Sequence, residues 1–376
     1  MNGELAEVLL AGLRAVTWQS VVMIAVAGVL LYLAIVRDYE PLLLVPIALG
    51  ALLANLPLSP MIGPDGLLTI LYDVGISTEL FPLLIFIGIG ALTDFGPLLE
   101  NPRMILLGAA GQFGIFSVLV LALLLGFTVA ESASIGIIGA VDGPTSIYVS
   151  EQLAPHLLAP IAVAAYSYMA LVPMILPPVM RALTTPAERR IRMRPVERPI
   201  SRRTRVLFPV VVTLVVGTLV PFAIPLVGSL MLGNIMRESG VVQRLTDTSS
   251  NELANVVTLF LGLAIGSTML GTTFLQPGTL AILGLGILAF AFDTAAGIVF
   301  AKGLNRLSGG SFNPLIGAAG ISAFPMAARV VQRVAEAEDF ENFPLMHAMG
   351  ANAAGQVAST VAGGVVLALV AGAAVA

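Results

Sequence analysis

Long apolar runs dominate this sequence, and they constrain its fold more than any other feature. Runs such as 17–36, 103–127 and 280–302 carry almost no charge, and a helix of about 20 apolar residues is long enough to cross a bilayer. Charged residues make up only 11% of the chain, whereas soluble domains contain about 25%. The sequence therefore predicts an all-α polytopic membrane protein.

Roughly ten to eleven transmembrane helices are expected, several of them short or interrupted. The predicted spans fall near residues 17–36, 40–56, 79–99, 103–127, 131–150, 155–181, 206–232, 250–270, 280–302, 312–330 and 344–373. Before them, apolar residues at helical spacing between Leu5 and Val16 predict an amphipathic surface helix. The same stretch lacks a basic start and a small-residue cleavage site, so a signal peptide is not expected.

One long polar segment, residues 184–205, sets the expected orientation in the cell membrane. Together with Arg181 it holds nine arginines, half of the 18 lysines and arginines of the chain. Because positively charged loops remain in the cytoplasm, counting spans from this segment places the N-terminus and residues 331–343 in the cytoplasm and the C-terminus outside. The segment is either a solvated linker attracted to anionic lipid or a docking surface for a cytosolic partner.

The two halves of the sequence resemble each other. Residues 87–111 match residues 263–286, and residues 138–149 match residues 316–330. Gly90 thereby pairs with Gly266, and Gly139 pairs with Gly317. The span count makes the repeats antiparallel, and inverted repeats with broken helices are typical of secondary transporters. The expected regions are a surface helix with two peripheral spans (1–78), a first repeat (79–181), a basic loop with a connecting span (182–249) and a second repeat (250–376).

Asp142 is the strongest candidate for chemistry. A charge at the centre of a spanning helix costs about 3 kcal/mol or more, which makes an intramembrane acid a functional candidate. Gly143 and Pro144 break the helix there, and a break exposes backbone carbonyls. Thr145 and Ser146 add hydroxyl oxygens, and a hard cation such as sodium takes oxygen ligands. The alternative role is a cap for the helix that begins at Pro144, and the two roles can coexist.

The matched break in the second half offers neutral oxygen atoms. Asn313, Ser322 and the backbone around Gly317 and Gly320 supply them without a carboxylate, and one acid with neutral oxygens suits a monovalent cation. Arg329 follows Ser322 by two helical turns on the same face. It either meets an anionic group at the cytoplasmic mouth or extends to the membrane interface.

Two further polar features lie within predicted spans. Asp293 is a second deeply placed acid, which either binds a cation or pairs within the helix bundle. In the last span, Asn352, Gln356 and Ser359 share one helix face, and they either bond neighbouring helices or line the site. The chain has no cysteine and only two histidines, so disulfides, thiolate metal sites and a zinc site are not expected.

Five motifs stand in order along the chain, and the similarity that they carry runs from about residue 20 to the C-terminus. They are GALTDFGPLLENP, DGPTSIYVS, AAYSYMALVP, LPPVMRALTTPAERRI and NPLIGAAGISAFPMAARV. Together they resemble the β subunit of the sodium-translocating, biotin-dependent decarboxylases, a family that includes oxaloacetate, methylmalonyl-CoA and glutaconyl-CoA decarboxylases. The family's fold resembles elevator-type secondary transporters. Its usual GGADGPT reads GAVDGPT here, and we expect little effect from Val141.

The resemblance implies a division of labour among subunits. In the family, a carboxyltransferase moves CO₂ onto a biotin held by a carrier protein, and the membrane β subunit decarboxylates this carboxybiotin. A proton is taken up from outside and sodium is driven outward. The implied partners are the biotin carrier, the carboxyltransferase and a small membrane γ or δ subunit, with the biotin not attached to this chain. We also expect a homo-oligomer and no nucleic-acid partner.

The resemblance also implies roles for individual residues. The sodium ligands fall on Asp142, Asn313, Gly317, Ser322 and Asn352. The carboxybiotin contacts fall on Arg329, Ser322 and Tyr168, and the catalytic roles fall on Asp142, Tyr166, Tyr168 and Arg329. Tyr166 and Tyr168 are two residues apart, so they point to different helix faces. The alternative function, which the sequence leaves open, is a secondary sodium or carboxylate carrier without decarboxylase activity.

Overall fold

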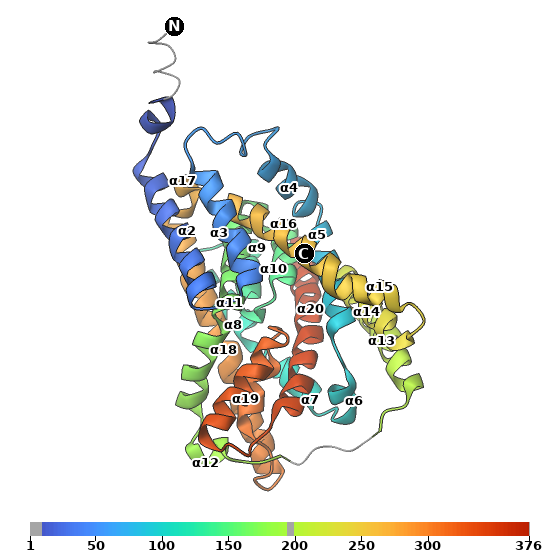
Figure 1. Cartoon of the computed structure of the whole chain (residues 1–376). Coiled ribbons are helices and arrows are strands. Elements are labelled where there is room, and N and C mark those ends of the chain that lie inside the picture. The colour runs from blue at the N-terminus through green and yellow to red at the C-terminus, as the bar shows by residue number, and fades with distance from the viewer. Residues whose placement is uncertain (1–9, 194–198, 376) are drawn as a thin grey trace.

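The chain is a bundle of helices joined by short turns (Figure 1). The computed structural model describes residues 10–193 and 199–375, and no β-strand occurs among them, which confirms the all-α class. The helices are α2 (Trp18–Val36), α3 (Pro41–Asn55), α4 (Leu67–Gly75), α5 (Leu80–Leu92), α6 (Gly96–Glu100), α7 (Met104–Ala110), α8 (Phe113–Leu124), α9 (Val129–Gly136), α10 (Gly143–Leu153), α11 (Leu158–Leu183), α12 (Pro186–Arg189), α13 (Arg202–Leu219), α14 (Ile224–Ser239), α15 (Gln243–Thr248), α16 (Ala254–Ser267), α17 (Gly271–Phe274), α18 (Pro277–Leu307), α19 (Met326–Glu338) and α20 (Leu345–Val375). Residues 5–9 of the predicted surface helix lie outside the described residues, and residues 10–14 are helical.

Five helical stretches of the described chain are long and apolar enough to cross a membrane. They are α2, the α7–α8 pair, α11 with the turn before it, α18 and α20. The bent pair α4–α5, with 66° between its helices, brings the number to six. The expected ten to eleven spans are therefore not confirmed by length and composition. Helices such as α3, α14 and α16 are shorter than a full span, and α13 begins with several arginines.

The predicted span 131–150 is instead a hairpin. Its two arms are α9 and α10, and a 3-10 turn over Ile137–Ala140 separates them. His156 Nε2, just after the second arm, lies 2.8 Å from Glu131 Oε1 in the first arm. The segment therefore returns to its starting side. The chain reverses at Val141, whose φ of +52° is in the left-handed region, and α10 then begins at the Gly143-Pro144 pair.

The predicted span 312–330 is also a hairpin. It consists of a 3-10 turn over Pro314–Gly320 followed by α19. The side-chain amides of Asn313 before it and Asn342 after it both donate to the backbone carbonyls of Arg189 and Ile191, at 2.9–3.3 Å. Because residues 313 and 342 bond the same two carbonyls, this segment also returns to its starting side.

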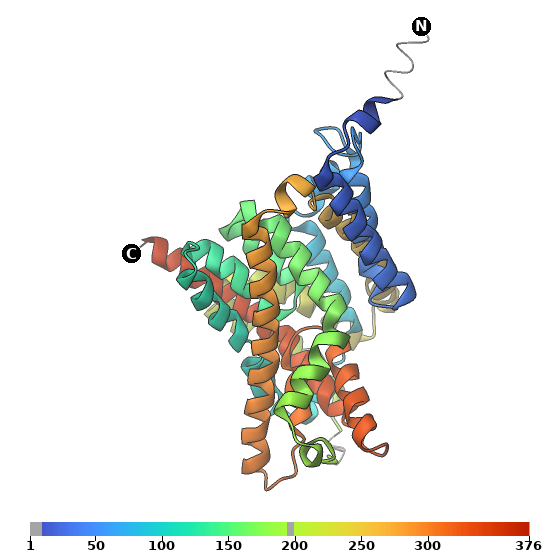
Figure 2. The ribbon, with the colours of Figure 1, turned by 90° about the vertical axis from the view of Figure 1, so that its left-hand side faces the viewer.

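The two hairpins enter from opposite ends of the molecule and meet at their tips. The base of the first lies beside the start of α11, and the base of the second lies at residues 189–191, just past the end of α11. The 26 residues of α11 span about 39 Å at 1.5 Å per residue, and Figure 2 shows how far α11 and α18 extend along the molecule. At the tips, the Ser322 backbone N–H and hydroxyl both donate to the Ala140 carbonyl, at 3.2 and 2.8 Å.

The start of α2 and the basic segment lie at different ends of the molecule. Asp94 Oδ1, at the end of α5, lies 4.0 Å from Arg205 Nη1 at the start of α13, so α5 ends beside the basic segment. Four helices, α2, α3, α4 and α5, precede this point, and Figure 1 shows α2 beginning at the end of the molecule opposite α12. Which side of a membrane each end faces stays a prediction.

The predicted span 206–232 also differs from the structure. It is two helices, α13 and α14, joined by a tight 3-10 turn over Pro221–Ala223. Gly217 near the end of α13 packs against Ile224 at the start of α14, so the chain reverses there. Pro221 and Pro225 favour the reversal, because proline cannot donate the backbone hydrogen bond that a continuous helix needs.

Two similar helix crossings involve the glycines that the sequence repeat matches. Gly90 of α5 crosses α14 at Gly233, and Gly266 of α16 crosses α3 at Gly50. A methyl group added at any of these four positions would meet the backbone of the facing helix at less than contact distance. Small residues at such crossings let two helix backbones approach closely.

A matching pair of hydrogen bonds lies beside these crossings. The Asn234 side-chain amide donates to the Thr93 carbonyl at 2.9 Å, and the Asn55 side-chain amide donates to the Met269 carbonyl at 2.7 Å. Thr93 and Met269 occupy the same position in the two matched sequence blocks. The α5–α14 pair and the α16–α3 pair therefore pack in the same way. In each pair, glycines meet at the crossing, and an asparagine of one helix donates to a backbone carbonyl just past the end of the other.

We predict that Gly90→Ala destabilises the protein by at least about 1–3 kcal/mol, because the added methyl overpacks the α5–α14 crossing. The matched control is Gly28→Ala in α2, where nothing lies within 4 Å of an added methyl. It should raise stability by up to about 1 kcal/mol through helix propensity. Thermal unfolding in detergent checks both variants, and equal midpoints for the two would contradict the packing account.

Candidate functional site

Asp142 stands at the tip of the first hairpin and is 2% exposed. Its Oδ1 accepts the backbone N–H of Thr145 at 3.3 Å, which caps α10. Its Oδ2 accepts the Ser359 hydroxyl at 2.6 Å and the Gln356 side-chain amide at 3.3 Å, both from α20. The capping role predicted for Asp142 is therefore confirmed, and the same carboxylate also joins α10 to α20. All of these donors are neutral, so the described protein supplies Asp142 with hydrogen bonds but not with a counter-charge.

The local sequence explains how Asp142 reaches this position. A methyl group at Gly143 would collide with the ring of Tyr166, so only glycine allows the tip to pack against α11. Val141 holds a left-handed backbone conformation that costs a β-branched residue about 1–3 kcal/mol. The expectation that Val141 has little effect therefore takes no account of this backbone strain.

Several buried oxygen atoms near Asp142 have no hydrogen-bond partner within the described chain. They are Thr145 Oγ1, Tyr166 Oη and Asn352 Oδ1. Thr145 is three residues from Asp142, Tyr166 packs on Gly143, and Asn352 lies one helical turn before Gln356 on α20. Buried polar atoms normally find partners. Unpartnered oxygens around one carboxylate therefore fit a monovalent cation with oxygen ligands.

The second hairpin contributes Ser322 and the backbone beside it. Ser322 is 3% exposed, and its hydroxyl lies near the Asp142 carboxylate while donating to Ala140. Asn352, whose Oδ1 is unpartnered, donates its side-chain N–H to the Ile321 carbonyl at 2.7 Å. Two of the predicted ligands, Ser322 and Asn352, are thus brought to the tip contact.

Other predicted site residues lie outside this cluster. Asn313 holds the base of the second hairpin, and its Oδ1 accepts the Leu315 N–H at 3.0 Å. Gly317 packs against the backbone of Gly297 in α18. The Tyr168 hydroxyl donates to the Leu283 carbonyl of α18 at 2.5 Å. Tyr166 and Tyr168 therefore point to different neighbours, as their spacing predicted, and the hydroxyl of Tyr166 is the one near Asp142.

Arg329 is exposed on α19, apart from the buried cluster. It faces the turn between α2 and α3, where Glu40 begins α3 with a φ of +37°. Burial raises the pKa of the Glu40 carboxyl, and the positive charge of Arg329 opposes that rise. A guanidinium in this position is available to an anionic group that approaches from outside the bundle.

Gln356 and Ser359 are the site residues that the family resemblance did not indicate. The polar face of the last span was the available signal, but the sequence left open whether it bonded a helix or lined a site. The structure shows that Gln356 and Ser359 join α20 to the first hairpin, and that their bonds end on the Asp142 carboxylate of the candidate site.

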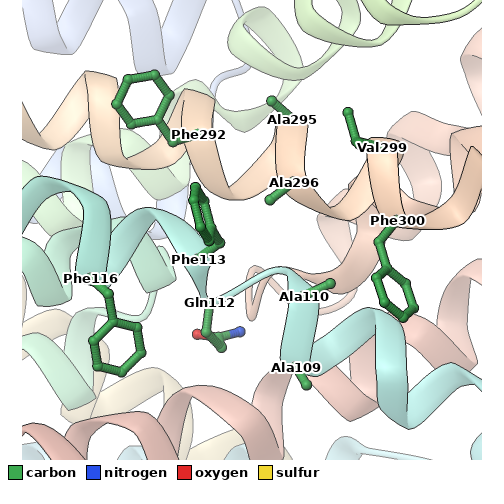
Figure 3. Close-up of a pocket in the computed structure, with 10 residues that line it drawn as sticks. All are labelled: Ala109, Ala110, Gln112, Phe113, Phe116, Phe292, Ala295, Ala296, Val299 and Phe300. Carbon is green, nitrogen blue, oxygen red and sulfur yellow. The ribbon is translucent and has the colours of Figure 1, made fainter. Parts of the chain in front are cut away.

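A separate groove of about 660 Å³ opens between α7–α8 and α18. Figure 3 shows that phenylalanine, alanine and valine side chains line it, with Gln112 as the polar residue among them. Such a lining suits the apolar chain of a membrane lipid rather than a charged ligand. The chemistry of this protein is therefore to be sought at the hairpin tips and at Arg329.

Comparison with known proteins identifies the family of this chain. The model of the family described as the Na⁺-transporting oxaloacetate decarboxylase beta subunit matches residues 19–370. The chain belongs to this family. It is 52% identical to the methylmalonyl-CoA decarboxylase subunit beta of Propionigenium modestum, over 95% of this chain and 96% of that protein. It is 51% identical to the glutaconyl-CoA decarboxylase subunit beta of Acidaminococcus fermentans, over 96% of each chain.

A third relative is the oxaloacetate decarboxylase beta chain of Klebsiella pneumoniae, 47% identical over 92% of this chain and 94% of that protein. The three relatives are named for three different substrates at similar identity. The chain is thus a membrane β subunit of the sodium-transporting decarboxylases. Family membership supports this function over a carrier without decarboxylase activity.

We predict that Ser359→Ala lowers the stability of the protein in sodium-free buffer by about 1–3 kcal/mol, because a buried acceptor loses its donor. The matched control is Thr360→Val, since the Thr360 hydroxyl donates only to the Val357 carbonyl of its own helix. Thermal unfolding midpoints measure the difference. A larger loss for Thr360→Val than for Ser359→Ala would show that the Asp142 contact does not stabilise the tip.

Proposed function

We propose that this subunit decarboxylates carboxybiotin presented by a carrier protein and couples the reaction to outward sodium transport. The observation that carries the proposal is the Asp142 carboxylate at the contact of two hairpin tips, with unpartnered buried oxygens beside it. Sodium is the transported ion and carboxybiotin the delivered substrate. The reaction consumes one proton, since the biotin ring nitrogen regains a hydrogen when the carboxylate leaves as CO₂.

In this proposal Asp142 alternates between a sodium-bound and a protonated form. Ser322, Asn352 and Thr145 complete the ion site with backbone carbonyls, while Gln356 and Ser359 hold the carboxylate in place. A bound cation favours the ionised carboxyl, and burial favours the neutral one. The site therefore carries no net charge either with sodium bound or with a proton bound. Asn313 and Gly317, first expected as ligands, act by holding the second hairpin.

Carboxybiotin is proposed to meet Arg329 from the cytoplasmic side. The exposed guanidinium matches a carboxylate in charge and geometry, and Ser322 leads from it toward the buried site. Tyr166 is the tyrosine whose hydroxyl is free of protein partners among the described residues, so it suits proton transfer or substrate contact near Asp142. Tyr168 supports the site through its bond to α18.

The proposed architecture has ten crossings and two re-entrant hairpins in an inverted, elevator-like repeat. The crossings are α2, α3, α5, α7–α8, α11, α13, α14, α16, α18 and α20. Support comes from the tip-to-tip hairpins and from the two glycine crossings. Since α3 and α14 share these crossings, the repeats extend N-terminally from the expected 79–181 and 250–376. With the basic segment in the cytoplasm, both chain ends face outside.

The biotin carrier and the carboxyltransferase are proposed to bind at the cytoplasmic face. The complex would also contain a small γ or δ subunit and further copies of this chain.

Some arginines of the basic segment already form ion pairs within the subunit. Arg189 pairs with Glu338 at 2.6 Å, and Arg192 pairs with Asp339 and Glu341 at 2.7 Å. These pairs support a structural role for residues 189–192 rather than a free docking surface.

We predict that Asp142→Asn abolishes sodium uptake driven by decarboxylation in proteoliposomes, because the neutral amide cannot exchange sodium for a proton. Asp94→Asn is the matched control, since Asp94 lies in a partly exposed ion-pair cluster with Arg205 and Arg237. It should keep at least about half of the wild-type rate, because exposed ion pairs contribute only about 0–1 kcal/mol. Undiminished uptake by Asp142→Asn would overturn the assignment.

A second experiment separates a decarboxylase from a carrier. The purified subunit should decarboxylate free carboxybiotin, and the rate should rise when sodium is added. Arg329→Ala should reduce this rate at least about tenfold, the equivalent of one lost charge-assisted contact of about 1.4 kcal/mol. Sodium exchange without any release of CO₂ would instead favour the carrier.

A further inference from the structure

Asp293 is the second of the two carboxylates that are almost fully buried in the described chain, and the proposed mechanism does not use it. It lies within α18 and is 0% exposed. Its Oδ1 accepts the backbone N–H of Gly114, and the carboxyl also lies near the backbone N–H of Ile115, both in the first turn of the half-helix α8. A negative charge at a helix N-terminus is stabilised by the helix dipole, so α8 compensates part of the cost of burying Asp293.

The other oxygen of Asp293 faces the first hairpin. Oδ2 has no hydrogen-bond partner within the described residues. A methyl group at Gly139 would lie 2.8 Å from Oδ2, and one at Gly114 would lie 2.7 Å from Oδ1. The carboxylate is therefore wedged between two stretches of backbone, where glycine is required on both sides. An added methyl at Gly139 would also lie 2.9 Å from Ala289 Cβ, so the first hairpin packs directly against α18 here.

Gly139 connects the buried Asp293 carboxylate to the proposed ion site. It precedes Ala140, whose carbonyl accepts both donors of Ser322, and it is three residues before Asp142. One turn along α18 from Asp293, Gly297 packs against Gly317 of the second hairpin. The same face of α18 therefore contacts both hairpins, and Asp293 is the charged residue on that face.

We propose that Asp293 is a positioning residue that fixes the tip of the first hairpin against α8, and thereby sets the geometry of the Asp142 ion site. The inference rests on the proposed function. Of the two roles expected for Asp293 from the sequence, the bond from the Gly114 N–H to Oδ1 favours pairing within the bundle over cation binding. When the Asp293 carboxylate no longer packs between Gly114 and Gly139, the tip of the first hairpin can shift. The Asp142 site is then less well preorganised and binds sodium more weakly. The chemical step on carboxybiotin, at a distance from α8, is unaffected.

The test compares Asp293→Asn with Thr294→Val in the complete decarboxylase complex. Asparagine keeps an Oδ1 acceptor for Gly114 but loses the charge and places an amide group against Gly139. Thr294 is buried on the same helix, and its hydroxyl donates only to the Phe290 carbonyl of that helix. Decarboxylation is measured against sodium concentration for each protein, together with the thermal unfolding midpoint.

For Asp293→Asn, we expect the sodium concentration at half-maximal rate to rise about tenfold, with the rate at saturating sodium within about twofold of wild type. Thr294→Val should leave both values unchanged. If Asp293→Asn does not fold, Gly139→Ala carries the test, because its methyl displaces Oδ2 and should produce the same split. An unchanged sodium requirement, a loss confined to the saturated rate, or an equal shift in Thr294→Val would overturn the proposal. Sodium-independent wild-type activity would instead overturn the proposed function.

Discussion

The rest of this structure depends on one hydrogen-bonded contact, in which the Ala140 carbonyl accepts both donors of Ser322. Each hairpin ends in backbone that no helix satisfies, and unsatisfied backbone is not tolerated in contact with lipid. The two tips solve this problem for each other, since the donors at one tip satisfy an acceptor at the other. Their meeting point is enclosed by α11, α18 and α20, and it is where a carboxylate and several free oxygens are found together.

The environment of Asp142 gives that contact its chemical character. Its partners are a hydroxyl, an amide and a backbone N–H, which orient the carboxylate without neutralising it. Asp293 is treated differently, because the start of α8 supplies it with a fixed positive potential. In the mechanism that we propose, one buried acid is left for a mobile cation or proton, and the other is held by the fold.

Sequence reasoning identified the chemistry of this chain better than its path through the membrane. The apolar runs gave the all-α class, and Asp142, Ser322 and Asn352 were placed together correctly. The segments 131–150 and 312–330 were read as spans because their composition is apolar on both arms of each hairpin. Composition does not distinguish a buried hairpin from a crossing helix, and only the contacts His156–Glu131 and Asn342–Ile191 show that the chain turns back.

The misread hairpins explain the other differences. Each hairpin replaces a predicted crossing with a reversal, so the number of spans on either side of the basic segment changes. The split of residues 206–232 into two helices is compatible with the antiparallel repeats that we propose. Asn313 has the residue type of an ion ligand, but its amide is needed to close a hairpin base. Gln356 and Ser359 depend on a contact between segments more than 200 positions apart, which periodicity within one helix does not reveal.

The absence of a built-in counter-charge for Asp142 among its described partners has a consequence for energy conservation. An ionised, empty site carries a full negative charge, and moving such a charge through a low-dielectric interior is strongly opposed. In the mechanism that we propose, the site changes sides at low cost only when a cation or a proton occupies it. A transporter built in this way would resist idle return of its empty carrier. The same electrostatics that bind the ion would then protect the sodium gradient from dissipation.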